Sequence, residues 1–301
     1  TATALANQFA QISVTNRYGA ITQLSPNLTV DTQAPGQKAD GTDETIAVPT
    51  VVLTESVNAT PGINAAEFSD GMQAQVTLPT GSVVGDKLEI AVTAPNGTVR
   101  VFSHTLILAD ITSGTAAVIL PTSTVAENGA YTLTASTTDV AGNTSKVSAP
   151  LSFILDTQAP GKNIDGSNAA IEAPVLTLLE AVNGVNQTEL ADGLQYQIQL
   201  PSGSKVGDVL SFTFTAPDGT VRTVTHTVTL GNVSAGTFDL SLSNALVNED
   251  GTYTVTVQST DIAGNVGNLA TTSFVLNASL STLSTFAQNN STGLLNASAG
   301  T

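Results

Sequence analysis

The chain has 301 residues and a formal net charge of −16, with 24 acidic against 8 basic side chains, and it contains no cysteine. This acidic balance excludes a basic surface for nucleic acid or for anionic lipid. The absence of cysteine excludes a disulfide-built scaffold and a thiol nucleophile. Apolar runs stay shorter than the roughly 18 residues of a membrane span, so no membrane insertion is expected.

The first 30 residues contain part of a motif that recurs twice later in the chain. Thr15-Asn16-Arg-Tyr-Gly19 aligns with Thr138-Asp139-Val-Ala-Gly142 and with Thr260-Asp261-Ile-Ala-Gly264. In each place the motif is followed by a strand-like run. We therefore expect residues 1–30 to supply the C-terminal strands of a preceding, partial module.

A six-residue phrase, Asp-Thr-Gln-Ala-Pro-Gly, occurs at residues 31–36 and again at residues 156–161. Proline and glycine after a carboxylate are typical of a joint between modules and not of a strand interior. The residues after each copy are also repeated, so the sequence predicts two complete modules, residues 31–155 and 156–277. Residues 278–301 contain no third copy and are interpreted as a tail or as the start of a further region.

Apolar and polar residues alternate with a period of two in both modules, which predicts half-buried strands. Asn96-Gly97 and Asp218-Gly219 predict hairpins, because a tight primed turn needs positive φ at both central residues. In the first module the predicted strands are 48–53, 74–78, 88–94, 99–108, 115–120, 130–137 and 147–155. About seven short strands per module without helical periodicity predict an all-β chain of tandem Ig-like antiparallel β-sandwiches in a linear array.

Residues suited to catalysis are scarce. His104 and His226 occupy equivalent positions of the same predicted strand in the two modules, which favours a packing or cross-strand role over a catalytic one. No Ser-His-acid set, glycine-rich phosphate loop or zinc-ligand spacing can be identified. We therefore do not expect an enzyme.

Acidic residues are concentrated in loops that the alternation of strand direction brings together. The loop between the sixth and seventh strands should return to the pole of the module that carries the joint phrase. The acids expected at this pole are Asp31, Asp40, Asp43 and Asp139 in the first module and Asp156, Asp165 and Asp261 in the second. The loop between the first and second strands lies at the opposite pole. It carries Glu55, Asp70 and Glu180, and Glu55 and Asp70 are expected to face the second joint.

Several carboxylates without histidine or cysteine form the ligand set of a hard cation, and flexible loops suit Ca²⁺ better than the strictly octahedral Mg²⁺. We therefore expect Ca²⁺ at these acidic positions. The alternative for any single acid is a turn residue, because Asp closes Asx turns and tolerates left-handed backbone. Convergence favours the metal at Asp31, Asp139, Asp156 and Asp261, since several unpaired carboxylates at one place repel one another.

The joint phrase and the loop 138–143, together with Glu67-Phe-Ser-Asp-Gly71 and Thr93-Ala-Pro-Asn-Gly-Thr98, resemble the tandem bacterial Ig-like repeats of giant surface adhesins. In that family, the RTX or biofilm-associated adhesins, the chain is exported by type I secretion, and the resemblance extends over nearly all of this sequence. It implies an extracellular location on the bacterial cell surface and interdomain Ca²⁺ that stiffens a long stalk. It also implies cell adhesion and biofilm formation, with neighbouring modules and a host or biofilm surface as partners. Asn168-Ala169 replaces Asp43-Glu44 at the second joint, which departs from a full acidic set there.

The expected function is that of a calcium-stiffened spacer segment of an extracellular adhesin. An alternative is a subunit of a self-assembling extracellular fibre, in which the N-terminal strands and the C-terminal tail complete a neighbour by strand addition. Carbohydrate binding by a module ranks last, because a chain with no tryptophan and 4 tyrosines offers few stacking platforms.

Overall fold

The computed structural model describes residues 12–15, 21–24, 31–55, 62–163, 165–180 and 184–278. The chain divides into two compact units, one formed by residues 1–63 and 67–155 and the other by residues 64–66 and 156–301. No helix within these described ranges is long and apolar enough to cross a membrane. Residues 279–301, nearly all of the predicted tail, lie outside the described part.

Two short strands precede the first joint. Strand β1 (Ile12–Thr15) pairs antiparallel with β2 (Ile21–Leu24), and the pair forms a two-stranded sheet of its own. The rest of residues 1–30 lies outside the described part, so the partial module expected there stays a prediction.

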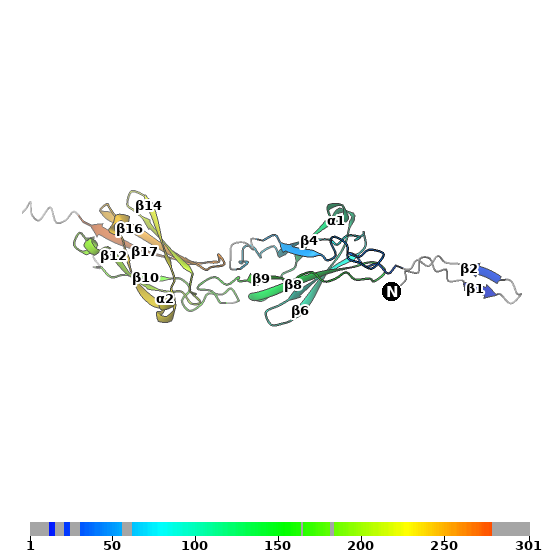
Figure 1. Ribbon diagram of the computed structural model, residues 1–301. Coiled ribbons are helices and arrows are strands. Elements are labelled where there is room, and N and C mark those ends of the chain that lie inside the picture. Colours follow the sequence, from blue (N-terminus) through cyan, green and yellow to red (C-terminus); the bar gives the residue numbers. More distant parts are fainter. Residues whose placement is uncertain are drawn as a thin grey trace, which may run out of the picture. The chain divides into compact units, whose positions relative to one another are not determined.

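The first unit consists of two antiparallel sheets packed face to face (Figure 1). One sheet has the order β3-β4-β7 and the other the order β6-β5-β8-β9. Their bounds are β3 Thr50–Leu53, β4 Met72–Thr77, β5 Lys87–Thr93, β6 Val99–Thr105, β7 Thr115–Leu120, β8 Gly129–Thr138 and β9 Leu151–Leu155. These strands confirm the predicted antiparallel sandwich.

The second unit repeats this architecture with one additional short strand. Its sheets have the orders β10-β12-β15 and β11-β17-β16-β13-β14, and the short β11 pairs parallel with the end of β17. The bounds are β10 Val175–Leu178, β11 Val185–Asn186, β12 Leu194–Gln199, β13 Val209–Thr215, β14 Val221–Thr227, β15 Thr237–Leu242, β16 Gly251–Thr260 and β17 Val266–Asn277. Two 3₁₀ turns, η1 (Glu189–Asp192) and η2 (Asn244–Leu246), complete the unit.

Each unit encloses its own core, built from the inward-facing residues of both sheets. On β5, Leu88, Ile90 and Val92 are fully buried, while the residues between them are exposed or half-buried. One aromatic pair is stacked in each core: Tyr131 on Phe153, with ring centroids 5.2 Å apart, and Tyr253 on Phe274 at 5.3 Å. Burial of each such large side chain contributes roughly 1.5–3 kcal/mol, so these lean cores still stabilise two independent sandwiches.

The connection between the two sheets contains a short helix in each unit, which the sequence did not predict. Helix α1 spans Leu108–Ser113 and α2 spans Leu230–Ala235, so the strand predicted over 99–108 ends at Thr105. The backbone N–H of Ile107 donates to Asp110 Oδ2 over 3.0 Å at the start of α1. Gly114, with φ of 71°, ends it. A helix of less than two turns carries no readable periodicity, which is why the sequence pattern did not reveal it.

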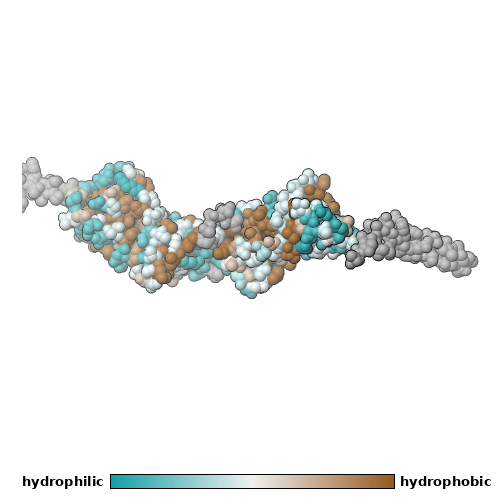
Figure 2. Space-filling view, viewed as in Figure 1, coloured by the Kyte–Doolittle hydropathy of each residue, from teal (hydrophilic) through white to brown (hydrophobic). Residues whose placement is uncertain are grey.

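Large apolar residues are also exposed on both units, in stretches separated by polar surface (Figure 2). Val101 on β6 is 58% exposed and Val221 on β14 is 57% exposed, and each lies on an edge strand of its sheet. The exposed residues of β6 are Val99, Val101, Ser103 and Thr105, and those of β14 are Val221 and three threonines. Isolated exposed apolar side chains are common on soluble domains, so these positions by themselves indicate no binding surface.

Candidate metal centres at the start of each module

The joint phrase is bound to the module that it begins. The backbone N–H of Gly36 donates to Thr80 O over 2.7 Å, and that of Gly161 donates to Ser202 O over 2.8 Å. Both glycines have positive φ, 87° and 82°. A Cβ at Gly36 would lie 2.4 Å from Ala47 O, and one at Gly161 would lie 1.9 Å from Glu172 O. Only glycine fits this backbone, so the last residue of the phrase is an anchor and not a loose hinge.

Asp31 and Asp139 lie together at the start of the first module, as strand parity predicted. Asn143 joins them, because its Nδ2 donates to Asp31 O over 3.1 Å and to Asp139 Oδ2 over 2.9 Å. Asp31 Oδ1 accepts the backbone N–H of Gln33 over 3.0 Å, which closes an Asx turn. The loop between the sixth and seventh predicted strands, residues 138–143, therefore returns to the joint phrase.

The second module repeats this arrangement with tighter burial. Asn265 Nδ2 donates to Asp156 O over 2.7 Å and to Asp261 Oδ2 over 2.9 Å. Asp261 is 8% exposed and Asn265 is 5% exposed. The same three positions thus form the start of both modules.

The structure adds one aspartate per module that the sequence analysis did not select, Asp86 and Asp208. They are 0% and 1% exposed. Oδ2 of Asp86 accepts the backbone N–H of Val83 over 2.9 Å, and Oδ2 of Asp208 accepts that of Lys205 over 2.8 Å. Oδ1 of each is buried and accepts no hydrogen bond of normal geometry. The only signal in the sequence was a Gly-Asp pair repeated at 85–86 and 207–208, which a simple turn explains equally well.

Burial raises the pKa of Asp86 above its ordinary value, and the backbone N–H groups of Val83 and Val140 oppose that rise. The negative charges of Asp139 and Asp31 raise this pKa further, so all three carboxylates interact. We call Asp31, Asp86 and Asp139 the first acid cluster. A buried carboxylate that faces two others without a cation is unfavourable.

Burial likewise raises the pKa of Asp208, and the charges of Asp261 and Asp156 add to the rise. We call Asp156, Asp208 and Asp261 the second acid cluster. Here the charge of Lys205 lowers the pKa of Asp208. Lys205 Nζ lies 3.1 Å from Asp156 Oδ2, so this cluster contains a basic side chain. The residue equivalent to Lys205 in the first module is Val83, which follows the same repeated Gly-Ser and precedes the same Val-Gly-Asp.

Three further predicted ligands lie in the loops that follow the joint phrases. Asp40 and Asp43 are in the first module, and Asp165 is in the second. Asp40 and Asp165 each close an Asx turn, and hydrogen bonds from Thr42 and Ser167 lower their pKa values. Asp43 forms an ion pair with Lys146. These contacts match the turn alternative, and metal ligation by these three acids stays a prediction.

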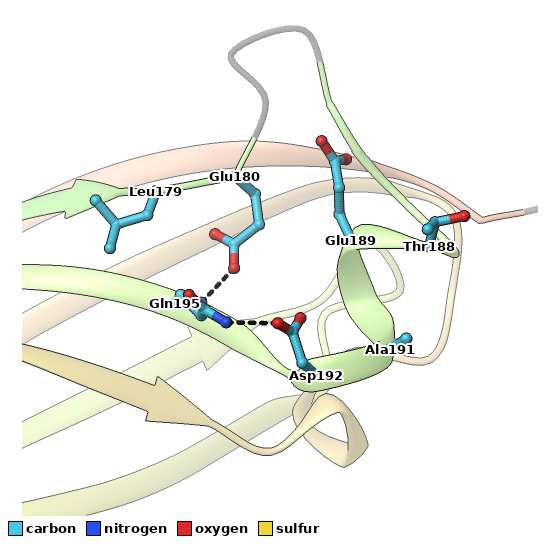
Figure 3. A pocket seen from close by; sticks show the side chains of 7 residues that line it. All are labelled: Leu179, Glu180, Thr188, Glu189, Ala191, Asp192 and Gln195. Carbon is cyan, nitrogen blue, oxygen red and sulfur yellow. Dashed lines mark hydrogen bonds between the residues drawn. The ribbon is translucent and has the colours of Figure 1, made fainter.

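The predicted acids of the opposite pole form a second repeated arrangement, drawn for the second module in Figure 3. Glu180 Oε1 accepts the backbone N–H of Gln195, whose Nε2 donates to Asp192 Oδ2 over 2.7 Å. The side chains of Glu180, Glu189 and Asp192 line the same open pocket (Figure 3). Oε2 of Glu180 and the hydroxyl of Tyr196 are buried without a hydrogen-bond partner.

The first module has the same pattern. Glu55 Oε1 accepts the backbone N–H of Gln73, and Gln73 Nε2 donates to Asp70 Oδ2 over 2.7 Å. Oε2 of Glu55 is buried without a partner, as in Glu180. That Glu55 and Asp70 face the second joint concerns how the two units are placed and stays a prediction.

The donor chemistry at both poles is that of carboxylate and backbone oxygens, which hard cations prefer. As placed in the described ranges, no three Asp, Glu, His or Cys side chains converge closely enough to hold a metal ion. An ion shared by a cluster therefore requires side-chain rotation. The unpartnered oxygens of Asp86 and Asp208 fit such an ion, because a cation would supply the partner that each lacks.

Both histidines contact the crossover helices. His104 Nε2 lies 2.8 Å from Asp110 Oδ2, and His226 Nε2 lies 3.1 Å from Asn232 Oδ1. The ring of His226 also stacks on Phe238 with centroids 4.6 Å apart. These contacts tie each histidine to the fold.

Comparison with known protein families places both modules. Residues 51–156 match one family of bacterial Ig-like domains, and residues 207–277 match a second family with the same description. The chain belongs to the bacterial Ig-like domains. The two matches together cover more than half of the chain. They confirm the resemblance predicted from the repeated motifs of these tandem Ig-like modules. No curated protein sequence matches the chain.

Several solved structures are similar to these Ig-like modules at low identity. One is a tetra-tandem repeat in the extending region of a large adhesion protein, with 17% identity and a TM-score of 0.34 over 91% of this chain. Another is a Ca²⁺-stabilised adhesin of an ice-binding Antarctic bacterium, with 18% identity and a TM-score of 0.39 over 91% of this chain. A third consists of fibronectin(III)-like modules of Clostridium thermocellum CbhA, with 16% identity and a TM-score of 0.37 over 76% of this chain and 95% of that one. The chain spans 57% of the length of each of the two adhesion-protein structures. Values this low transfer no function.

Proposed function

We propose that this chain is a spacer segment of an extracellular bacterial adhesin, whose Ig-like modules are stiffened by Ca²⁺ bound at the joints. In this proposal the segment has no catalytic role. It holds other parts of a longer cell-surface protein away from the cell, in support of adhesion and biofilm formation. Its partners are neighbouring modules of the same chain, and the host or biofilm surface is contacted by other parts of the full protein.

A structural role is supported by the repetition itself. Two Ig-like modules share the joint phrase, the loop that returns to it and the buried aspartate behind it. A site for one specific ligand would not require each of these features twice. The histidines are tied to the crossover helices by hydrogen bonds, which supports a packing role for them.

The observation that carries the Ca²⁺ proposal is the unpartnered Oδ1 of Asp86, fully buried and within the electrostatic reach of Asp31 and Asp139. A buried, ionised carboxylate oxygen without a donor is costly, and a divalent cation supplies both the charge and the coordination that it lacks. Ca²⁺ accepts six to eight oxygens in flexible geometry, so backbone carbonyls of the joint and water complete its shell. The equivalent ligands at the second joint are Asp156, Asp208 and Asp261.

We include the opposite pole in the proposal as a second class of Ca²⁺ site. Glu55 with Asp70, and Glu180 with Asp192, present one buried unpartnered oxygen per module beside a second carboxylate. Asp40, Asp43 and Asp165 are proposed as peripheral ligands that are reached when their loops rearrange.

Thermal unfolding of the full chain with Ca²⁺ and with a chelator tests this function. Because Ca²⁺ binds the folded state alone, it should raise stability by RT ln(1 + [Ca²⁺]/Kd), about 2.7 kcal/mol at one hundred times Kd. Extracellular modules bind Ca²⁺ with Kd of roughly 10⁻⁴–10⁻³ M, so the titration should extend to tens of millimolar. Mg²⁺ at the same concentration is the control for ionic strength. Identical melting curves in Ca²⁺, Mg²⁺ and chelator would contradict the proposal.

One observation supports the alternative of a self-assembling fibre subunit. Strands β1 and β2 pair only with each other within the described residues, so they offer edges to which a strand of a neighbouring subunit could be added. A fibre subunit should polymerise after purification, whereas a spacer stays monomeric. Light scattering against concentration separates the two functions.

A further inference from the structure

We propose that Lys205 is an internal cation of the second acid cluster and makes the Ca²⁺ affinity of that cluster weaker than that of the first. This inference rests on the proposed function, because it concerns the same joints. It assigns the two joints different roles: the first depends on Ca²⁺, and the second is already partly neutralised by the chain itself.

The two modules differ at one residue of the turn that precedes the buried aspartate. The turn before the buried aspartate reads Gly81-Ser-Val-Val-Gly-Asp86 in the first module and Gly203-Ser-Lys-Val-Gly-Asp208 in the second. The backbone of the turn is the same in both, since residues 83 and 205 each donate their N–H to Oδ2 of the aspartate three positions later. Only the side chain at this position differs.

The lysine side chain reaches the cluster. Lys205 Nζ lies 3.1 Å from Asp156 Oδ2, and its positive charge acts on Asp208. Asp156 Oδ1 is already held by the backbone N–H of Gln158 over 3.2 Å, so both oxygens of Asp156 are engaged. A metal ion that binds Oδ2 of Asp156 therefore competes with the ammonium group of Lys205.

The first cluster has no such cation. Among the described residues, no basic side chain forms an ion pair with Asp31, Asp86 or Asp139, and Val83 is 53% exposed. Two basic groups of this region pair with other acids: Lys146 with Asp43 in the neighbouring loop and Lys87 with Glu89 on β5. The first cluster therefore keeps three uncompensated carboxylates, one of them with a buried, unpartnered oxygen.

An acidic cluster alone does not make a site, but each cluster also contains a buried carboxylate oxygen, Oδ1 of Asp86 or of Asp208, without a hydrogen-bond partner of normal geometry. The two clusters differ in charge, and the backbone N–H of Val140 also acts on Asp86. One unit charge at about 5 Å from a divalent ion, at effective dielectric constants of about 20–80, changes its affinity by on the order of tenfold or more. Lysine is flexible and strongly hydrated, so it can leave the site at high Ca²⁺ concentration.

Calorimetric Ca²⁺ titration of the full chain tests this with exchanged residues. The second cluster is read in a background carrying Asp139→Asn and the first in a background carrying Asp261→Asn, which removes one ligand from the other cluster. In these backgrounds Lys205→Val should tighten the second site by about tenfold or more, and Val83→Lys should weaken the first by a similar factor. Lys205 is 60% exposed at its side chain and Val83 is also largely exposed, so both variants should fold.

The matched control is Lys87→Val on β5. Lys87 pairs with Glu89 in the first module, where it directly follows Asp86, and the equivalent residue of the second module is already Val209. This variant removes the same charge from the chain as Lys205→Val but lies in the other module, so it should change the affinity of the second site by no more than about twofold. Lys205→Gln, which keeps the length of the side chain without its charge, should follow Lys205→Val.

The outcomes separate this inference from the proposed function. If the chain binds Ca²⁺ at the joints but Lys205→Val and Val83→Lys leave both affinities within twofold of their backgrounds, the inference is overturned and the proposed function stands. If neither joint binds Ca²⁺ in any background, both are overturned. A tighter second site in Lys205→Val and Lys205→Gln, with Lys87→Val unchanged, supports the inference.

Discussion

The two modules begin with the same backbone but balance its charges differently. In both, an asparagine joins the joint phrase to the returning loop, and a buried aspartate lies beneath. Among the described residues, no basic side chain pairs with the three carboxylates of the first module, whereas Lys205 pairs with Asp156 in the second. The loops after the joints differ too, since Lys146 pairs with Asp43 in the first module and Asn268 bonds to Asn168 over 3.2 Å in the second.

The backbone conformation of the joint and the charge around it therefore vary independently between the two modules. The hydrogen bonds that place the joint are made by backbone and amide groups, which do not depend on the cation. In the proposed function, the affinity for a cation is set by side chains around that fixed backbone. A single substitution can therefore retune one joint without altering the architecture.

The largest effect is expected from a substitution that disrupts the shared backbone conformation of the joint phrase and leaves its charge unchanged. Gly161→Ala should lower the free energy of unfolding of the second module by roughly 3 kcal/mol or more, because a left-handed alanine costs about 1–2 kcal/mol before any clash. The clash is with Glu172 O, 1.9 Å from the added Cβ. Gly166→Ala is the control, since φ is 80° there and nothing lies within 4 Å of the added atom. Urea unfolding measures both, and equal losses for the two variants would contradict a close approach at Gly161.

The asparagine clamps come next. Asn265→Ala should cost about 2 kcal/mol and Asn143→Ala about 1 kcal/mol, because the removed hydrogen bonds are more deeply buried in the second module. Asn268→Ala, which removes an exposed amide contact, should cost less than about 0.5 kcal/mol. Chemical unfolding of the three variants checks the ranking. A larger loss of stability for Asn143→Ala than for Asn265→Ala would contradict this ranking. It would indicate that the asparagine at the first joint contributes more to stability.

Substitution of the buried aspartates tests the difference in charge between the first and second acid clusters. In chelator, Asp86→Asn should stabilise its module by about 1 kcal/mol, because it removes a buried charge that faces two other carboxylates. Asp208→Asn should stabilise less, since Lys205 already offsets part of the repulsion. In about 10 mM Ca²⁺ the sign should reverse for Asp86→Asn, because binding stabilisation is lost. Thermal unfolding under both conditions measures this, and the same sign in Ca²⁺ and in chelator would contradict a role for Asp86 in binding.

The smallest effect concerns the crossover helices. Asp110→Asn converts the contact with His104 into the pair that the second module uses between Asn232 and His226. The amide still accepts from the backbone, so the loss should be below about 1 kcal/mol. Any loss that comes from the ion pair should shrink between 0.1 and 1 M NaCl, whereas a loss that does not change with salt points to packing. Circular dichroism melting curves at the two salt concentrations distinguish these causes.

The sequence was sufficient for the sandwich fold and for the meeting of Asp139 with Asp31. Alternating residues and repeated turns reveal the strands, and strand parity determines which loops share a pole. It was not sufficient for Asp86 and Asp208, because a Gly-Asp pair at a turn looks the same whether its carboxylate is solvated or fully buried. Burial there depends on packing against the returning loop, which lies 53 residues further along the chain for Asp139.

Lys205 and helix α1 were missed for related reasons. A lysine in a loop is normally a solvated residue, and its contact with Asp156, 49 residues away, requires the folded joint. The six residues of α1 hold a single turn between two sheets, fixed by Asp110 and Gly114 and not by any apolar period. Local sequence patterns contain neither the tertiary contact of Lys205 nor a readable period over the six residues of α1.

The central claim is that Ca²⁺ stiffens the chain between its modules. Because the chain has no cysteine, Val101→Cys and Val221→Cys, on exposed positions of β6 and β14, allow one spin label in each module. The width of the label-to-label distance distribution should narrow from chelator to about 10 mM Ca²⁺. In Lys205→Val it should narrow at a lower Ca²⁺ concentration. A width that is the same in chelator and in saturating Ca²⁺ would contradict the account.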